Sequence, residues 1–457
     1  MKRYQKSMLE GPLFLNIVTY TIPIILTSLL QLLFNAADLV VVGRYCGSVS
    51  VAAVGATGSI TNLVINLFVG LSIGAGVTTA HAIGRRDEMA LHRTVHTALP
   101  LAMISGLILT VVGVAFAETF LQWMGTPDEV RRLSALYMRI FFGGMVFNMV
   151  YNFCAAILRA AGDTKGPLIY LTIAGVINVL LNVLFVTVFH MNVAGVALAT
   201  TISQGVSAVL VVLALMRRTD GCKLYLQKMR FHKVQLVEIT GKGLPAGIQG
   251  SLFSISNVVI QSSINSFGDV FMSGSAACSN IEGFVYVCMN AFMQTATNFT
   301  GQNAGAGQYK RIRKIAVICM ACVAAVGMTL GGIVYLFAPE LLSIYITDSA
   351  QAIAYGVDRM KYLVLPYFLL GLHEVVTGML RGLGSSVTPM VISVLGVCGL
   401  RVLWVSTIFA MPQFHTPGWL FVSYPISWVV TFVAEAIMFL IVYRKQAAAY
   451  LQTIERE

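Results

Sequence analysis

Charge is scarce in this sequence. Only 11% of its 457 residues are Asp, Glu, Lys or Arg, whereas 57% are hydrophobic and the mean hydropathy is +0.80. A water-soluble chain of this length could not remove so much apolar surface from water, which excludes a soluble fold. The net charge of +11 does not indicate nucleic acid, because the basic residues cluster in short segments between apolar runs. That distribution is typical of membrane helices, and we expect no nucleic-acid partner.

The motifs of common enzymes are also missing. The sequence contains no G-x-x-x-x-G-K-[ST] phosphate loop, no H-E-x-x-H metal motif and no recognisable Ser-His-Asp spacing. Its eight cysteines are scattered, and the C-x-x-C of Cys319 and Cys322 lies inside an apolar run without a nearby His or acid. We therefore expect no enzyme, no metal and no cofactor. Active transport would then need an ion gradient or a separate protein as its energy source.

Long apolar runs, by contrast, fill the chain. A helix needs about 20 apolar residues to cross a bilayer. Twelve candidate runs occur, at 13–43, 52–80, 94–117, 133–158, 166–189, 193–216, 238–267, 273–300, 315–337, 357–380, 388–411 and 416–443. The sequence predicts an all-α polytopic membrane protein with twelve transmembrane helices. With the hydrophilic stretch 217–242 counted as the loop after the sixth run, the loops after even-numbered runs and the two tails carry 23 Lys and Arg residues, against three in the other loops. Both termini are therefore predicted to be cytoplasmic.

The chain also repeats itself. The sequence RAAGDTKGP at 159–167 reappears as RGLGSSVTP at 381–389, and Pro23 recurs as Pro245 at the same offset. A hydrophilic stretch at 217–242 separates six runs from six. These features predict an N-terminal six-helix lobe at 1–222 and a C-terminal six-helix lobe at 223–457. An even number of spans in each copy places the pseudo-two-fold axis along the membrane normal.

Asp38 stands out in the first run, which has no charged residue between Gly11 and Ala37. A carboxylate in the middle of a membrane helix costs about 2.5–3.5 kcal/mol and usually faces a cavity or a partner. We interpret Asp38 as functional; the alternatives are a polar contact that fixes helix packing, or hydration near the surface. Gln31 and Asn35 are one helical turn apart in the same run, and Asn35 lies close to Asp38.

Asn178 and Asn182 are also one turn apart and share a helix face. Their amides could coordinate a cation such as Na⁺ together with Asp38, or they could hold helices together.

Further ionisable residues fall within later runs. Arg401 is the basic residue that we place near the middle of a span, where it could pair with Glu374 or Glu435, or contact a coupling ion or substrate. Glu282 either lines a cavity or serves packing. His373 precedes Glu374, and we favour packing over a proton relay for this histidine.

Several stretches resemble the multidrug and toxic compound extrusion (MATE) transporters over nearly the whole chain. They are IPIILTSLLQLLFNAADLVVVGRYCGSVSVAAVGA, INVLLNVLF, GQNAGAGQYKRIRK and the repeated LRAAGDTKGP and LRGLGSSVTP. The resemblance implies two six-helix lobes around a V-shaped cavity, and export of organic, mostly cationic, amphipathic compounds in exchange for H⁺ or Na⁺. It identifies Asp38 with the family's first-helix aspartate, Pro23 with its helix-bending proline, and Asn178 and Asn182 with its fifth-helix polar pair.

Two departures leave the coupling ion open. One branch of the family has an aspartate where this chain has Asn182, and another has an acid in the seventh helix, which is missing between Leu244 and Ser266. Asp38 is therefore the main candidate for the coupling residue, and Glu282 and Glu374 are secondary candidates.

The resemblance further implies drug-like substrates, contact with membrane lipid, and a monomer in the bacterial inner membrane. The alternative is a lipid-linked oligosaccharide flippase of the same fold superfamily. A flippase should carry several basic residues in its cavity to hold a pyrophosphate, and the single mid-span Arg401 favours drug export. Isolated acids in duplicated bundles also suit alternating access better than a channel pore.

Overall fold

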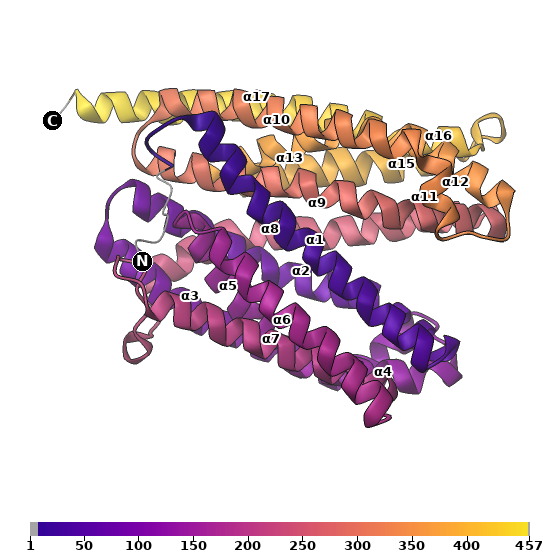
Figure 1. Ribbon diagram of the computed structural model, residues 1–457. Helices are drawn as coiled ribbons and strands as arrows, with labels where there is room; N and C mark the ends of the chain where they lie inside the picture. Colours follow the sequence, from indigo (N-terminus) through magenta and orange to yellow (C-terminus); the bar gives the residue numbers. More distant parts are fainter. Residues whose placement is uncertain (1–7, 456–457) are drawn as a thin grey trace. The chain divides into compact units, whose positions relative to one another are not determined.

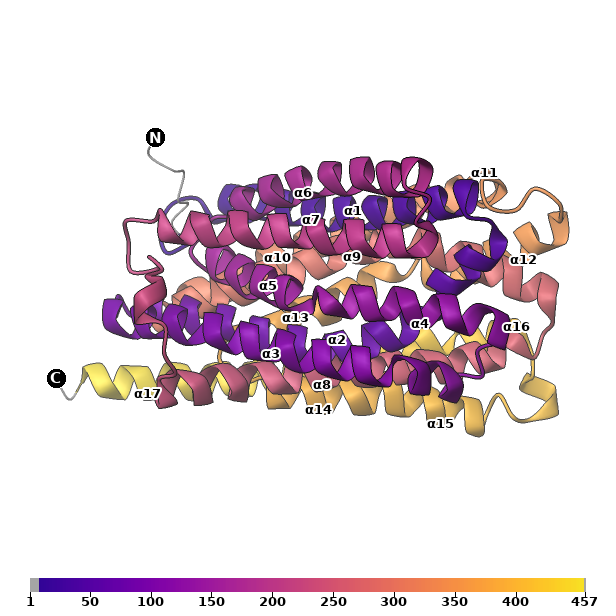
Figure 2. The ribbon, with the colours of Figure 1, turned by 90° about the horizontal axis from the view of Figure 1, so that it is seen from below.

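The computed structural model describes residues 8–455, without the side chains of Ser48, Ser59, Ile60, Thr453 and Ile454. Every regular element in this range is a helix (Figures 1 and 2). Lys2, Arg3 and Lys6, which contributed to the predicted orientation, lie outside it. The all-helical membrane fold predicted from the apolar runs is confirmed.

Contacts divide the chain into two compact units. We call Ile22–Ser251 the N-terminal unit, and Met8–Thr21 together with Leu252–Glu457 the C-terminal unit. Both divisions fall inside a helix, so α1 (Leu13–Tyr45) and α8 (Lys233–Asn265) each supply residues to both units. The lobes at 1–222 and 223–457 stay a prediction, because contact clusters mark packing rather than the duplication.

Besides α1 and α8, the elements of this part of the chain are α2 (Ser48–Gly84), α3 (Glu88–Trp123), α4 (Asp128–Gly143), α5 (Met145–Ala160), α6 (Lys165–Val183), a π-helix (Leu184–Val188), α7 (Asn192–Met216) and a 3₁₀ turn (Leu226–Lys228). In the N-terminal unit, α5 is the central helix and packs against α2, α3 and α7, while α6 and α7 run side by side (Figures 1 and 2).

In the C-terminal unit, α13 takes the central place and packs against α9, α10 and α17. Its elements are α9 (Asp269–Gly305), α10 (Tyr309–Leu336), α11 (Ala338–Ser343), α12 (Ala350–Leu363), α13 (Tyr367–Gly382), α14 (Val387–Ser393), a π-helix (Val394–Gly399), α15 (Leu400–Ser406), a 3₁₀ turn (Pro412–Phe414), α16 (Pro417–Phe421) and α17 (Ser423–Ile454).

The twelve predicted runs all correspond to helices, although two of them bend. Within the described residues, nine helices are long and apolar enough to cross a membrane, and the bent pairs α4–α5 (47°) and α12–α13 (44°) raise this number to 11. The remaining run is α9, which is long enough at 37 residues but less apolar. Much of α9 is buried against protein, so fewer of its side chains need to suit lipid.

The repeated sequences fold into the same turn. Gly162 and Gly384 both have positive φ values, +87° and +85°, which favour glycine. Each of these glycines donates its N–H to the carbonyl of the arginine that opens its repeat, Gly162 to Arg159 at 2.9 Å and Gly384 to Arg381 at 2.8 Å. The two copies of the repeated sequence thus adopt the same backbone turn.

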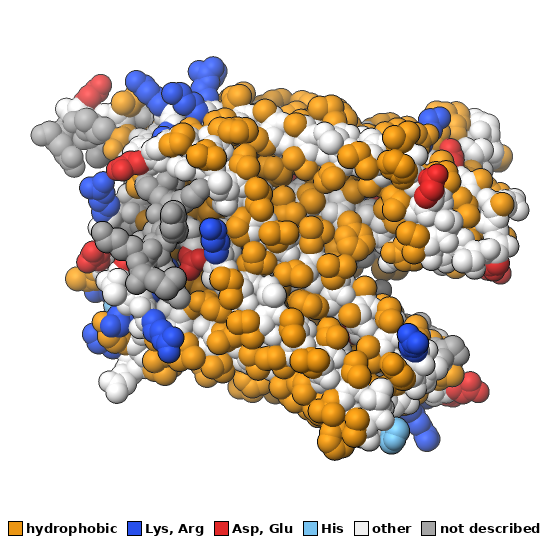
Figure 3. All heavy atoms as spheres, viewed as in Figure 1, with side chains coloured by type: hydrophobic (Ala, Val, Ile, Leu, Met, Phe, Trp, Pro, Cys, Tyr) orange, Lys and Arg blue, Asp and Glu red, His pale blue; other side chains and the backbone are white. Residues whose placement is uncertain are grey.

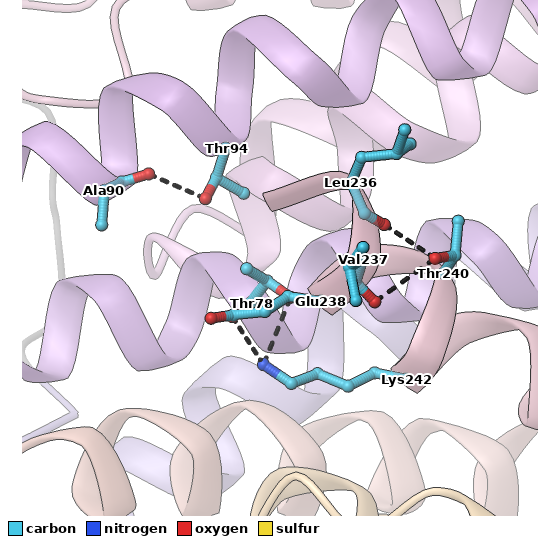
Figure 4. Close-up of polar contacts among 8 residues, drawn as sticks. All are labelled: Thr78, Ala90, Thr94, Leu236, Val237, Glu238, Thr240 and Lys242. Carbon is cyan, nitrogen blue, oxygen red and sulfur yellow. Dashed lines mark hydrogen bonds and ion pairs between the residues drawn. The ribbon is translucent and has the colours of Figure 1, made fainter. Parts of the chain in front are cut away.

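On the face drawn in Figure 3, hydrophobic side chains cover the lengths of the helices, and the Lys and Arg side chains in view lie near the helix ends. Several hydroxyl groups inside the helices bond to carbonyl groups of their own helix. The hydroxyls of Thr94 and Thr240 donate to carbonyl oxygens one turn earlier, Ala90 and Leu236, each at 2.8 Å (Figure 4). Lys242 on α8 donates to Glu238 at 3.1 Å and to Thr78 on α2 at 3.4 Å, so this mostly buried ammonium joins the two helices.

Glycines allow α2 and α8 to approach backbone to backbone. Gly70 and Gly74 on α2 face Gly243 and Gly247 on α8, and a Cβ at any of them would collide with backbone atoms of the other helix. The one-turn spacing of the glycines on both helices is the small-residue pattern of close membrane-helix packing.

This contact predicts that Gly247→Val destabilises the protein while Gly241→Val does not. The valine at 247 would push against the Leu67 carbonyl, and such overpacking costs about 1–3 kcal/mol. Gly241 lies on the same helix, and a Cβ added there would meet no atom within 4 Å, so its replacement should stay within about 0.5 kcal/mol. Thermal unfolding of both variants in detergent checks this, and equal midpoints would contradict the close contact.

Candidate functional site

Asp38 lies in a polar cluster inside the N-terminal unit. Its side chain comes from α1 and is only 9% exposed. Nδ2 of Asn182 on α6 donates to Asp38 Oδ1, and the Thr200 hydroxyl on α7 donates to Asp38 Oδ2 at 3.3 Å. Side chains from three helices therefore meet at one carboxyl group.

Asn178 completes this group, which we call the Asp38 cluster: Asp38, Asn178, Asn182 and Thr200. Asn178 donates to the Thr200 hydroxyl and accepts from Asn182, both at 3.3 Å. The Oδ1 atom of Asn182 is buried and accepts no hydrogen bond from a described residue. The cluster thus has an acceptor oxygen to spare next to the carboxyl group.

Local features of the sequence position these side chains. Gly175 on α6 lets the Phe34 ring of α1 lie against the α6 backbone, where any Cβ would clash. This close packing brings Asp38, one turn further along α1, within reach of α6. The π-helix Leu184–Val188 begins just after Asn182, and such segments often occur beside functional sites.

Sequence reasoning found three members of the Asp38 cluster but missed Thr200. A signal existed in the polar stretch TTISQ inside the apolar α7 run. Gln31 and Asn35 are exposed and form no hydrogen bond with any described residue, so they stay outside the cluster although they share its face of α1. Pro23 is buried just after the point where α1 changes unit, and Thr27 donates to its carbonyl at 2.7 Å.

Glu282 is committed to an ion pair in the C-terminal unit. Its Oε1 lies 3.2 Å from Nε of Arg359 on α12, and Arg359 Nη2 donates to its Oε2 at 3.3 Å. The Cys278 thiol also donates to Oε1 at 3.1 Å. This geometry is that of a packing contact; a coupling role for Glu282 stays a prediction.

Glu435 and His373 form a second buried pair. His373 Nδ1 lies 3.1 Å from Glu435 Oε2, which also accepts from Thr377 at 2.8 Å, while Ser393 donates to Oε1 at 2.7 Å. Glu374, the next residue of α13, is buried at 7% exposure and lies within electrostatic range of Arg381.

The expected pairing of Arg401 with Glu374 or Glu435 is wrong. Its Nε donates to Ser427 at 2.9 Å, and its guanidinium carbon lies 3.9 Å from the centre of the Tyr424 ring. Glu435 is already occupied by closer partners. Arg401 is also not alone: Arg359 and Arg381 are each only 5% exposed. Arg381 was assigned to a basic loop from the sequence, but α13 continues past it to Gly382 and buries it.

The comparison with protein families agrees with the duplication. The model of the MatE family matches residues 23–184 and 245–405, two segments of nearly equal length. Both begin at the prolines already identified as equivalent, Pro23 and Pro245.

Curated relatives match over most of their length. The chain is 27% identical to the probable multidrug resistance protein YoeA of Bacillus subtilis, covering 90% of each chain. It is 24% identical to the probable multidrug resistance protein NorM of Thermotoga maritima, covering 84% of this chain and 83% of that one. The multidrug export protein MepA of Staphylococcus saprophyticus is 22% identical over 87% and 88%.

Solved structures show the same fold. An outward-facing multidrug resistance MATE family transporter of the MOP superfamily superposes with a TM-score of 0.89 at 22% identity, covering 98% of this chain and 99% of that one. A crystal structure of MATE in complex with MaL6 gives 0.87 at 22% identity, covering 97% and 98%. Because the family model covers more than half of the sequence, this chain belongs to the MatE family, the multidrug and toxic compound extrusion transporters that its sequence resembles.

Proposed function

We propose that this protein is a secondary active antiporter that exports organic, mostly cationic and amphipathic compounds in exchange for H⁺ or Na⁺. The Asp38 cluster is the observation that carries the proposal, because it offers one ionisable group and spare oxygen atoms inside transmembrane helices. The names of the relatives, multidrug resistance and multidrug export proteins, support drug-like substrates.

Exchange follows from the physical chemistry of one buried carboxyl group. Apolar surroundings disfavour its charged form unless a positive partner is present. A proton, a sodium ion or a cationic substrate can each supply that partner, but they exclude one another at a single carboxylate. Release of the coupling ion therefore restores attraction for the substrate, and binding of the ion abolishes it.

The cluster suits either coupling ion. A proton needs only the carboxylate. A sodium ion needs several oxygens, and Asp38, Asn178, Asn182 and Thr200 supply carboxylate, amide and hydroxyl oxygens of the kind hard cations prefer. The buried, unpaired Oδ1 of Asn182 is the atom that such an ion would satisfy.

The first helix offers a route from ion binding to movement. Its turns before Pro23 belong to the C-terminal unit, where Thr21 bonds Thr295 at 2.9 Å, and its later turns carry Asp38 in the N-terminal unit. Proline interrupts helix hydrogen bonding and permits bending. We therefore place the hinge of alternating access at Pro23, and both termini in the cytoplasm of a bacterial inner-membrane monomer.

The buried arginines make the flippase alternative harder to exclude than the sequence suggested. Among the described residues of the C-terminal unit, three guanidinium groups are buried instead of the one expected, so a scarcity of basic residues no longer speaks against a flippase. Arg359 is neutralised by Glu282, and Arg381 lies near Glu374. One uncompensated guanidinium is a weak match for a pyrophosphate, so drug export stays the better proposal.

Asp38→Asn should abolish ion-driven accumulation of an ethidium-like cation in inverted membrane vesicles, because the amide cannot exchange a proton and carries no charge. Asp128→Asn makes the same chemical change on an exposed side chain and should leave accumulation unchanged. Fluorescence of the dye during energisation provides the measurement. Full accumulation by the Asp38 variant would remove this residue from the mechanism.

Asn182→Leu should change the concentration of coupling ion needed for half-maximal transport by about tenfold or more, downward if the ion is H⁺ and upward if it is Na⁺. The change removes a hydrogen bond that stabilises the charged carboxylate of Asp38, worth about 1.5–3 kcal/mol, which favours proton binding. It also removes the spare amide oxygen that a sodium ion would need. Asn280→Leu is the control, since Asn280 is exposed and bonds only its own helix at Ala276. An unchanged ion requirement in the Asn182 variant would show that the amide serves packing alone.

Collapsing the proton and sodium gradients separately should identify one coupling ion. If one proton exchanges for one monovalent cation, a pH difference of one unit supplies about 1.4 kcal/mol, or roughly tenfold accumulation. No net charge moves, so clamping the membrane potential should have no effect. Accumulation beyond tenfold per pH unit in dye-loaded vesicles would require a second coupled ion.

A further inference from the structure

Arg401 holds a positive charge inside the C-terminal unit without an acidic partner. It is the second residue of α15 and is 5% exposed. Its guanidinium stacks on Tyr424 at 3.9 Å and lies 5.7 Å from the Trp428 ring centre. Nε donates to Ser427, whose own proton goes to the Tyr424 carbonyl, so the side chain is fixed on α17.

Most of its donors are unused. A guanidinium carries five N–H groups, and only Nε–H has an acceptor among the described residues. Glu282 acts on Arg401 electrostatically, but both of its oxygens are already bonded to Arg359. Together these three side chains carry two guanidinium groups and one carboxylate, which leaves one positive charge. Buried charges are normally paired, and aromatic stacking replaces only part of a lost counter-ion.

The position of Arg401 in the duplication supports a binding role. When the two copies are aligned on their shared prolines, Arg401 corresponds to Val179, next to Asn178 of the Asp38 cluster, and Tyr424 corresponds to Ile202, close to Thr200. The position equivalent to Asp38 is Ile260, which is buried and apolar. Equivalent helices thus carry polar centres at matching positions in both copies, one built on a carboxylate and the other on a guanidinium.

We propose that Arg401 with Tyr424 and Trp428 forms a binding site for amphiphilic organic anions, in which the guanidinium takes a carboxylate or sulfonate group. Two parallel N–H···O bonds are the geometry that guanidinium groups offer such oxyanions, and the two rings provide contact for an apolar body. The site deepens the proposed export function, on which it rests for its role, by adding anionic or zwitterionic compounds to the substrates.

A matched pair of ligands tests the site without any gradient. Dansylglycine carries a carboxylate, whereas dansylglycinamide has the same body and no charge. Purified protein in phosphatidylcholine nanodiscs is titrated with each, and energy transfer from the protein's four tryptophans to dansyl reports binding. The wild type should bind the acid at least tenfold more tightly than the amide. Equal affinities in the wild type would overturn the proposal, whatever any variant does.

Substitutions then assign the preference to one side chain. Arg401→Gln should remove the preference for the acid, Arg401→Lys should keep part of it, and Arg139→Gln, which changes an exposed arginine, should keep all of it. A preference unchanged in Arg401→Gln would contradict the assignment. Competition by phosphatidylglycerol in the nanodisc would support the oxyanion site and identify a lipid headgroup as its source. If the protein exported no cations but still preferred the acid, the antiport proposal would be refuted and the anion-binding site would stand.

Discussion

The need to neutralise charge in apolar surroundings governs the interior of this protein. An isolated ion is strongly disfavoured there, so buried ionisable groups must find partners. Glu282 has Arg359, and Glu435 has His373, Thr377 and Ser393. These contacts join α9 to α12, and α17 to both α13 and α14, so the C-terminal unit uses its acids largely to fix helix packing.

Asp38 is compensated differently. It receives hydrogen bonds from an amide and a hydroxyl, but no basic side chain forms an ion pair with it among the described residues. The Thr200 hydroxyl has one proton to share between Asp38 and the Val196 carbonyl, so even this support is divided. A carboxylate held by neutral donors keeps its affinity for a mobile cation, whereas one locked to arginine loses it.

The sequence predicted the helices well, because an apolar run of about 20 residues is the typical pattern of a membrane-spanning helix. It also predicted the duplication and three members of the Asp38 cluster, since residues one turn apart must share a face. Periodicity does not reveal which face meets which helix. The partners Thr200 and Arg359 were therefore missed, and Arg401 was paired wrongly. Arg381 was assigned to a loop because it is basic and directly precedes a turn, but α13 ends only at Gly382.

The duplication explains why the two copies differ in chemistry while they keep the same backbone. The turns at Gly162 and Gly384 depend on backbone φ values that strongly favour glycine. The polar centres depend only on side chains, which can change sign without disturbing the helices. Asp38 and Ile260 occupy equivalent positions, as do Asn178 and Leu400. One copy therefore holds a buried carboxyl group among neutral donors, and the other pairs its acids in packing contacts and presents a fixed positive charge.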